Sequence, residues 1–410
     1  MSRLLIATNT LYQLASRLSG VASSFLLTLI ITKSLGAYQF GQFVKIITFV
    51  GVFYTPLDFG INAVALKLFT KPNSNPSRIF SELLTTRLFL ALLFLFLSLF
   101  ITALLPGTAT TGFTQTVKLG ILILSFTLFA QAAVKSTNAV FQHHLSYQFT
   151  LATDLVQGVF VLASAYLAVS LNNILPIIVG YLLGGFAAAA IQLLFVSRFF
   201  TFSLTTPELK TIKKLLLPAL PLGITLILST LHLRTDLLVL SVFRPTVEVG
   251  VYGLSKKIFE TILVIPTFFT NSLYPFLLRF KGSRLIYTSS LFMLLIALLA
   301  TVAIFVSAPL LTRVKPEFAA GIGELRLLSL TLPLFFVTAP LMWHLIGLGK
   351  DKVLVPIYTL ALIVNAAINL LFVPRFGALA SIVGLAVSET STLLLLLYFV
   401  SQSYGRKLLH

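Results

Sequence analysis

The chain has 410 residues, of which 58% are hydrophobic and only 10% are charged, whereas roughly 25% of the residues of a soluble domain are charged. This composition excludes a soluble globular protein. The formal net charge of +18 would indicate nucleic acid in a soluble chain, but a membrane protein places basic residues in cytoplasmic loops and against anionic headgroups, so we expect membrane lipids and no nucleic acid as partners.

Long apolar runs follow one another along the chain, separated by short polar breaks. Each is long enough to cross the hydrocarbon core as a helix, which takes about 20 residues. The runs are continuous and rich in leucine, without the alternation that a membrane strand shows. They predict an all-α polytopic membrane helical bundle of about twelve transmembrane helices, at 11–33, 40–66, 80–105, 115–140, 148–170, 174–197, 214–240, 249–277, 285–311, 320–347, 352–373 and 378–403.

The most polar connection lies near the middle of the chain, between Arg198 and Lys214, and leaves six predicted helices on each side. Two lobes of six helices are a recurrent plan in transporters, in which the substrate path runs between the halves. We therefore predict an N-terminal six-helix lobe (1–200), a cytoplasmic linker (201–213) and a C-terminal six-helix lobe (214–410).

Lysine and arginine are unevenly shared between alternate loops, and an excess of these residues marks the cytoplasmic side. With a cytoplasmic N-terminus, the inner flanks carry Arg3, Lys67, Lys71, Arg78, Arg87, Arg198, Lys210, Lys213, Lys214, Arg279, Lys281, Arg284, Lys350, Lys352, Arg406 and Lys407. The outer flanks carry Lys33, Lys118, Arg244, Arg313, Lys315 and Arg375. This bias predicts a multi-pass protein of the cytoplasmic (inner) membrane with both termini in the cytoplasm.

Several predicted spans contain polar and ionisable residues, which are costly in lipid and usually face a bundle interior or a water-filled cavity. Some recur every three or four residues and so share a helix face: Asn9, Gln13 and Arg17; Tyr54, Asp58 and Asn62; Gln131, Lys135, Asn138 and Gln142. Later spans hold His232, Arg234 and Asp236; Lys256, Lys257 and Glu260; Asn365, Asn369 and Glu389. The spacing of Lys256, Lys257 and Glu260 permits an ion pair within one helix.

These residues have two interpretations. Arg17, Lys135 and Lys256 lie within a few turns of a predicted helix end, where long basic side chains could reach the headgroups. Cations outnumber anions within the spans, however, and a buried charge without a partner is costly unless water or an anionic ligand meets it. A cationic cavity for an anionic ligand accounts for the whole set. Asp58 and Asp236 could neutralise neighbouring cations or bind a coupling ion.

Sequence signatures of enzymes are missing. The chain contains no GxxxxGK[ST] phosphate loop, no HExxH helix and no GxSxG nucleophile turn. An integral-membrane glycosyltransferase or polymerase stays open as an alternative, although such enzymes commonly have larger loops with paired charges. We expect a membrane transporter and no enzyme, with no cofactor and no metal site.

Degenerate motifs along the chain resemble those of the Wzx-type polysaccharide (O-antigen and repeat-unit) flippases, within the multidrug/oligosaccharidyl-lipid/polysaccharide exporter superfamily. They are Leu35-Gly36-Ala37-Tyr38-Gln39-Phe40-Gly41, Asp58-Phe59-Gly60, Asp236-Leu237-Leu238-Val239-Leu240, Val249-Gly250-Val251-Tyr252-Gly253-Leu254-Ser255-Lys256-Lys257 with Glu260, Ser272-Leu273-Tyr274-Pro275, and Asn365, Asn369, Pro374, Gly377 and Glu389. The resemblance extends over essentially the whole chain, and the order and spacing of the motifs carry it.

The resemblance implies two six-helix lobes that work by alternating access. It also implies a function, namely moving undecaprenyl-diphosphate-linked oligosaccharide repeat units from the inner to the outer leaflet. A diphosphate would account for cations within the spans. The related peptidoglycan lipid flippases typically have fourteen spans, two more than are predicted here. The drug exporters favour organic cations and would not be expected to need so basic an interior. Both differences favour the polysaccharide flippases. A drug or metabolite exporter of the same fold is the alternative.

The predicted site has two groups of residues. The cavity for the diphosphate and glycan is predicted from Arg17, Lys45, Lys135, Arg234, Lys256, Lys257, Gln13, Gln131 and Asn138. Coupling to an H⁺ or Na⁺ gradient, or charge balance, is predicted for Asp58, Asp236 and Glu260. We expect a monomer, with association with polysaccharide assembly proteins left open.

Overall fold

The computed structural model describes residues 3–405 except 73, 109, 205–208 and 280–282. Lys281, Arg406 and Lys407 of the predicted inner flanks, and residues 205–208 of the predicted linker, lie outside the described residues. The described chain is helical almost throughout and contains no β-strand, only an isolated bridge between Gly107 and Gly112. The all-α prediction is therefore confirmed.

The chain divides into two compact units, Met1–Ile227 and Leu228–His410. We call them the N-terminal and C-terminal units, and the boundary between them falls inside α9. The helices that begin in the N-terminal unit are α1 (Arg3–Ile30), α2 (Gly36–Asp58), α3 (Ile61–Phe69), α4 (Pro76–Leu104), α5 (Gln115–Ser125), α6 (Thr127–His144), α7 (Gln148–Leu171), α8 (Leu175–Val196) and α9 (Leu209–Phe243).

The C-terminal unit continues from the second part of α9. Its further helices are α10 (Thr246–Ile262), α11 (Val264–Arg279), α12 (Ser283–Ser307), α13 (Leu311–Val314), α14 (Gly321–Ser329), α15 (Leu332–Gly347), α16 (Leu354–Phe376) and α17 (Ala378–Gly405). Short turns of 3₁₀-helix cover Ala308–Leu310, Pro316–Ala320 and Asp351–Val353.

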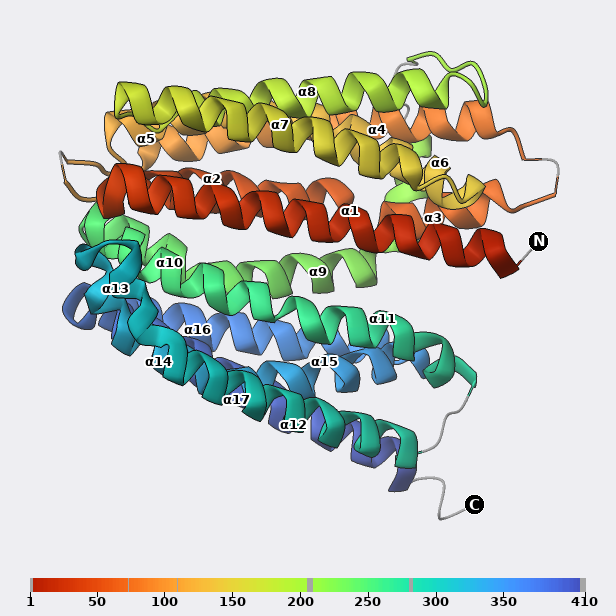
Figure 1. Ribbon diagram of the computed structural model, residues 1–410. Helices are drawn as coiled ribbons and strands as arrows, with labels where there is room; N and C mark the ends of the chain where they lie inside the picture. The colour runs from red at the N-terminus through yellow and green to blue at the C-terminus, as the bar shows by residue number, and fades with distance from the viewer. Residues whose placement is uncertain (1–2, 73, 109, 205–208, 280–282, 406–410) are drawn as a thin grey trace. The chain divides into compact units, whose positions relative to one another are not determined.

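The helices account for the predicted spans. In the described residues nine helices are long and apolar enough to cross a membrane, and ten if the bent pair Pro316–Ser329 and Leu332–Gly347 is one span. The first, Thr8–Phe69, has 62 residues, and Figure 1 shows the chain reversing between α1 and α2, so it supplies two spans. Helices α10 and α11, of 17 and 16 residues, are each short of a crossing but meet at Leu263. Counted as one, they complete the predicted set of about twelve.

Two local features explain where the helices turn and break. A π-helical turn at Ile31–Leu35 leads into Gly36, whose φ of 82° is open to glycine but strained for other residues. Between α2 and α3, Phe59 and Gly60 both have left-handed backbone, with φ of 44° and 67°. The second break interrupts one apolar run and leaves Asp58 at the end of α2, where it can meet side chains from other helices.

Close packing of α7 against α8 rests on small residues. A Cβ atom on Gly180 would lie 2.1 Å from the Ser164 hydroxyl oxygen, and one on Gly184 would lie 3.0 Å from the Phe160 Cβ. Helices in lipid attract each other by such close contact because lipid tails are as apolar as the side chains. Figure 1 shows the two helices running side by side in the N-terminal unit.

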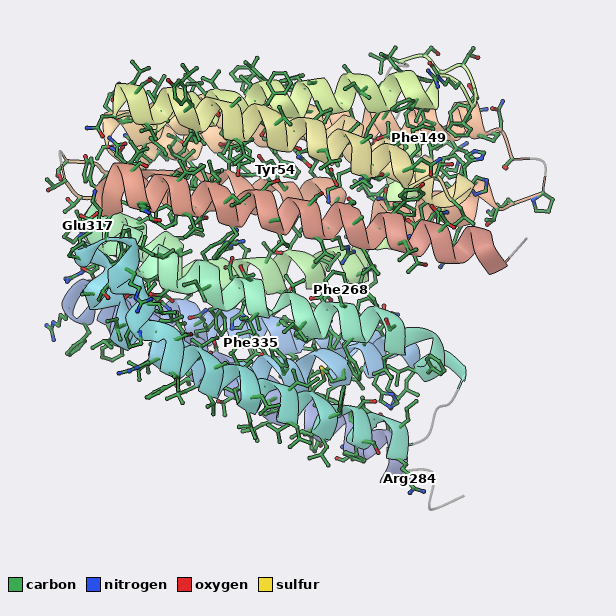
Figure 2. The ribbon with its side chains drawn as sticks, in the orientation of Figure 1. Tyr54, Phe149, Phe268, Arg284, Glu317 and Phe335 are labelled. Atoms are coloured by element: carbon green, nitrogen blue, oxygen red, sulfur yellow. The ribbon has the colours of Figure 1, made fainter. Side chains whose placement is uncertain are left out.

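Each unit has its own apolar core. In the N-terminal unit, buried side chains of α3, α4, α6, α8 and α9 pack together, among them Ile61, Phe80, Phe141, Val196 and Leu215. In the C-terminal unit the core joins α12, α15, α16 and α17 through Ile286, Leu341, Leu345, Ile357, Leu396 and Val400. Large apolar side chains are also exposed along the helices, and the projecting side chains are mostly carbon (Figure 2), as expected of surfaces that face hydrocarbon.

Candidate functional site

A charged cluster inside the N-terminal unit joins α2, α4 and α6. The Asp58 carboxylate lies 3.1 Å from Arg87 Nη2 and 3.6 Å from Lys135 Nζ. The Arg87 side chain is fully buried, whereas Lys135 and Asp58 are 33% and 31% exposed. We call Asp58, Arg87 and Lys135 the N-terminal charge cluster. It sets two cations against one carboxylate.

Arg87 holds this cluster together. Its Nη2 also donates to Asn62 Oδ1 at 2.8 Å, and its Nη1 donates to the Ser136 hydroxyl at 3.4 Å. A guanidinium fixed on several sides positions the carboxylate that it binds. The placement of Arg87 on an inner flank was wrong, since it is the twelfth residue of α4 and completely buried. Its position inside an apolar run was the signal that could have revealed it.

Other polar residues of the N-terminal unit lie near this cluster in the sequence. Tyr54, one turn before Asp58, bonds Thr127 at 2.6 Å and lies in the middle of the unit (Figure 2). On the predicted polar face of α6, Gln131 and Asn138 are half-buried. Asn138 accepts a hydrogen bond from Thr150 at 3.2 Å, which ties α6 to α7.

Lys45 lies elsewhere. It is buried on α2, and its ammonium donates to the Gly112 carbonyl at 2.7 Å. The bond fastens the loop before α5 to α2. This contact gives Lys45 a structural role, so we leave it out of the proposed binding set.

Arg17 and Gln13 lie on α1, where Arg17 is exposed and Gln13 is half-buried. Arg17 lines a cavity of about 390 Å³ between α1, α7 and α8, together with Asp154, Gln157 and Tyr181. Asp154 was missed by the sequence analysis, although a carboxylate inside the 148–170 run meets the criterion applied to the other spans.

A second charged cluster lies in the C-terminal unit. Arg234 Nη1 is 3.1 Å from Glu260 Oε1, with side-chain exposures of 34% and 23%. Lys257 is half-buried and lies one helical turn before Glu260 on α10. We call Arg234, Lys257 and Glu260 the C-terminal charge cluster. Like the first, it sets two cations against one carboxylate.

A closed ion pair lies on the same two helices. Lys256 Nζ is 2.5 Å from Asp236 Oδ2, and that oxygen also accepts the Tyr252 hydroxyl at 2.7 Å. The other oxygen accepts the Leu237 backbone N–H at 2.7 Å. The two charged side chains are 1% and 0% exposed. Lys256 thus pairs across helices and not with Glu260, and its charge is already compensated, so we assign Asp236 and Lys256 to charge balance.

A buried polar network links α9, α15, α16 and α17. His232 Nε2 bonds the Ser388 hydroxyl at 2.7 Å, and His232 Nδ1 lies 4.0 Å from Glu389 Oε2. Thr338 donates to Glu389 at 2.6 Å, and Asn365 donates to the His232 carbonyl at 2.7 Å. These polar groups satisfy one another within the unit, as buried groups generally do. In the described part of the chain, no three His, Asp or Glu side chains are grouped so as to hold a metal ion.

The fold is that of a class of membrane transporters. One similar solved structure is the lipid II flippase MurJ in an inward closed conformation, with TM-score 0.74, 14% identity, and coverage of 96% of this chain and 87% of that one. A multidrug resistance MATE family transporter of the MOP superfamily, in an inward-facing conformation, has TM-score 0.68, 14% identity and coverage of 96% and 95%. The MATE multidrug transporter DinF-BH has TM-score 0.65, 16% identity and coverage of 98% and 96%.

The family follows from the sequence itself. Residues 6–281 match the Polysaccharide biosynthesis protein family, which is more than half of the chain. The chain belongs to this family. A search of curated proteins gives no match.

Proposed function

We propose that the protein is a Wzx-type flippase, which carries undecaprenyl-diphosphate-linked oligosaccharide repeat units from the cytoplasmic to the outer leaflet of the inner membrane by alternating access. Membership of the Polysaccharide biosynthesis protein family supports this proposal. So does the likeness in fold to a lipid II flippase. The observation that carries it is the pair of charge clusters, one in each unit.

Each cluster has one positive charge in excess, because two cations face one carboxylate. In the N-terminal charge cluster, Arg87 is buried on Asp58, and Lys135 stays one-third exposed at the longer distance of 3.6 Å. In the C-terminal charge cluster, Lys257 lies one helical turn from Glu260, the partner of Arg234. Excess charge inside a membrane span is costly unless an anion meets it. A diphosphate diester, with a negative charge on each phosphate, is such an anion.

The residues then divide by role. Within each unit the cations are assigned to phosphate, Arg17 and Lys135 in the N-terminal unit and Arg234 and Lys257 in the C-terminal unit. Arg87 is a positioning residue that acts through Asp58. The half-buried amides of Gln13, Gln131 and Asn138 are assigned to sugar hydroxyls.

We assign the driving force to an H⁺ or Na⁺ gradient. Asp58 and Glu260 are the carboxylates that carry it in this proposal, because both are partly exposed and in contact with the cations that bind substrate. A cation that binds the carboxylate would release its basic partner, which couples ion binding to diphosphate binding. Both termini lie in the cytoplasm, and the protein works as a monomer that can associate with polysaccharide assembly proteins.

A deletion strain tests the function. Loss of a flippase leaves lipid-linked repeat units on the cytoplasmic leaflet, whereas loss of a drug exporter or a glycosyltransferase does not. We expect the wild-type gene to restore transport and the double variant Lys135→Ala/Lys257→Ala to reduce it at least tenfold while still reaching the membrane.

The matched control removes two exposed lysines, Lys71→Ala and Lys352→Ala, one from each unit. This control takes away the same net charge and should transport normally. Normal transport by the Lys135→Ala/Lys257→Ala protein would overturn the proposal.

A further inference from the structure

The cavity beside Arg17 differs from the charge clusters in its chemistry. It has a volume of about 390 Å³ and is lined by Ser16, Arg17, Asp154, Gln157 and Tyr181 among others. Sites for small molecules usually have volumes of about 300–1,000 Å³. The cavity lies wholly within the N-terminal unit, so its lining is defined by that unit alone.

One glycine of α1 and one glycine of α7 line the cavity. A Cβ atom on Gly20 would meet no other atom within 4 Å, and one on Gly158 would lie 3.0 Å from the Ser23 hydroxyl oxygen. The helices are joined on the N-terminal side of this opening, because Asn9 accepts a hydrogen bond from the Tyr147 backbone at 3.1 Å. The cavity is therefore a gap between two helices that are in contact on its N-terminal side.

Asp154 is the acidic residue of the cavity lining. It is the seventh residue of a 24-residue membrane helix, a position at which an acidic group is costly and usually serves function. Ser16 donates a hydrogen bond to Asp154 Oδ2. A carboxylate has two oxygens and about four acceptor sites, of which the Ser16 hydroxyl uses one.

The rest of the lining complements a sugar. Gln157 supplies both donors and an acceptor, and Arg17 supplies donors only, which matches hydroxyl groups that donate and accept. Tyr181 adds an aromatic ring, which lies tilted against Phe43 at 6.2 Å; an aromatic face packs well against the apolar C–H face of a sugar ring. The negative charge of Asp154 disfavours a phosphate in the same place.

We propose that this cavity binds the sugar joined directly to the diphosphate, with Asp154 and Gln157 bonding its hydroxyls and Arg17 bonding the adjoining phosphate. The inference rests on the proposed function, since it assumes a lipid-diphosphate-linked glycan as substrate. In such a substrate the first sugar follows the diphosphate immediately. A cavity with Arg17 and Asp154 in one lining suits that junction of a charged and a neutral group.

Cysteine protection tests the occupant directly, because the chain contains no cysteine and a single introduced one is the only reactive thiol. Ser24→Cys places it in the cavity lining, and Ser170→Cys places a control on the exposed side of α7. The probes are lipid-linked repeat units extracted from the deletion strain and undecaprenyl diphosphate without sugar. We expect the glycan-bearing lipid to slow maleimide labelling of Ser24→Cys about tenfold and of Ser170→Cys not at all. Equal protection by undecaprenyl diphosphate, or no protection at Ser24→Cys, would overturn the inference.

Two substitutions test the same point by affinity. Asp154→Asn keeps the size of the side chain and removes its charge, and Gly20→Leu fills the open space. Each should weaken binding of the glycan-bearing lipid about tenfold and leave binding of undecaprenyl diphosphate unchanged. Gly323→Leu is the matched control, since a Cβ at that exposed glycine also meets nothing within 4 Å.

The outcomes separate the inference from the proposed function. If Lys135→Ala/Lys257→Ala abolishes flipping while Gly20→Leu and Asp154→Asn bind and flip glycan-bearing lipid normally, the sugar site is wrong and the flippase stands. If the lysine variant flips normally, the proposed function itself fails.

Discussion

Asp58 and Asp236 are both aspartates inside membrane helices with basic partners, yet their surroundings differ. Asp58 is one-third exposed and has two cations, at 3.1 and 3.6 Å. Asp236 is completely buried and has one cation at 2.5 Å, a tyrosine hydroxyl and a backbone N–H. The two charges of the buried Asp236–Lys256 pair compensate each other. The N-terminal charge cluster is partly exposed and has one cation in excess. Exposure and partner number therefore distinguish the two aspartates.

The largest effect is expected at the closed pair. Asp236→Ala leaves the Lys256 ammonium buried without a carboxylate, which typically costs about 3–5 kcal/mol. We expect a strong loss of folded protein in detergent, measured by fluorescence-detected size exclusion after heating. Asp236→Ala/Lys256→Met replaces both charges with apolar groups and should recover most of the loss. A double variant no more stable than the single one would show that the pair is not the cause.

The second largest effect is expected for Arg87→Ala, because Arg87 belongs to the N-terminal charge cluster and is fully buried. It removes hydrogen bonds to Asp58 and Asn62, and a hydrogen bond to a charged group contributes about 1.5–3 kcal/mol. Asp58 recovers part of this loss, because it is partly exposed to water and keeps Lys135 as a partner. Both stability and transport should fall, the first in thermal unfolding and the second in the deletion strain. Loss of transport with full stability would mean that Arg87 contacts substrate and does not merely position Asp58.

Lys45→Met tests a buried lysine away from both clusters. It leaves the Gly112 carbonyl without its donor, which costs about 1–3 kcal/mol for a buried polar group. The free energy of unfolding should drop by that amount, and transport per folded molecule should not change. A tenfold loss of transport in folded Lys45→Met protein would return this residue to the binding site.

Lys135→Ala should change stability least among these variants, since a partly exposed ion pair contributes about 0–1 kcal/mol. Its transport should nevertheless fall severalfold. Thermal unfolding and glycolipid flipping measured on the same preparation give both values. If Lys135→Ala destabilised the protein as much as Asp236→Ala, exposure would not distinguish the two charged groups.

Much of this arrangement could be predicted from the sequence. Apolar runs of span length gave the all-α membrane bundle, because a helix in lipid must satisfy its own backbone and its length is set by the bilayer. Helical periodicity placed Tyr54, Asp58 and Asn62 on one face of a single helix. The structure breaks that helix at Phe59 and Gly60, so Asp58 and Asn62 lie on different helices, although both bond Arg87. Position along an apolar run was a weaker guide, since it put Arg87 on a flank and passed over Asp154.

The sequence alone determined that the chain is a helical membrane protein and which polar residues lie inside its membrane helices. The tertiary structure decided which charges meet. Lys256 and Glu260 are four residues apart on one helix, yet Lys256 pairs with Asp236 and Glu260 with Arg234. Ion pairs depend on distances of a few ångströms between separate helices, and those distances are set by the packing of whole helix faces. That packing buries Asp236 completely and leaves Asp58 partly exposed.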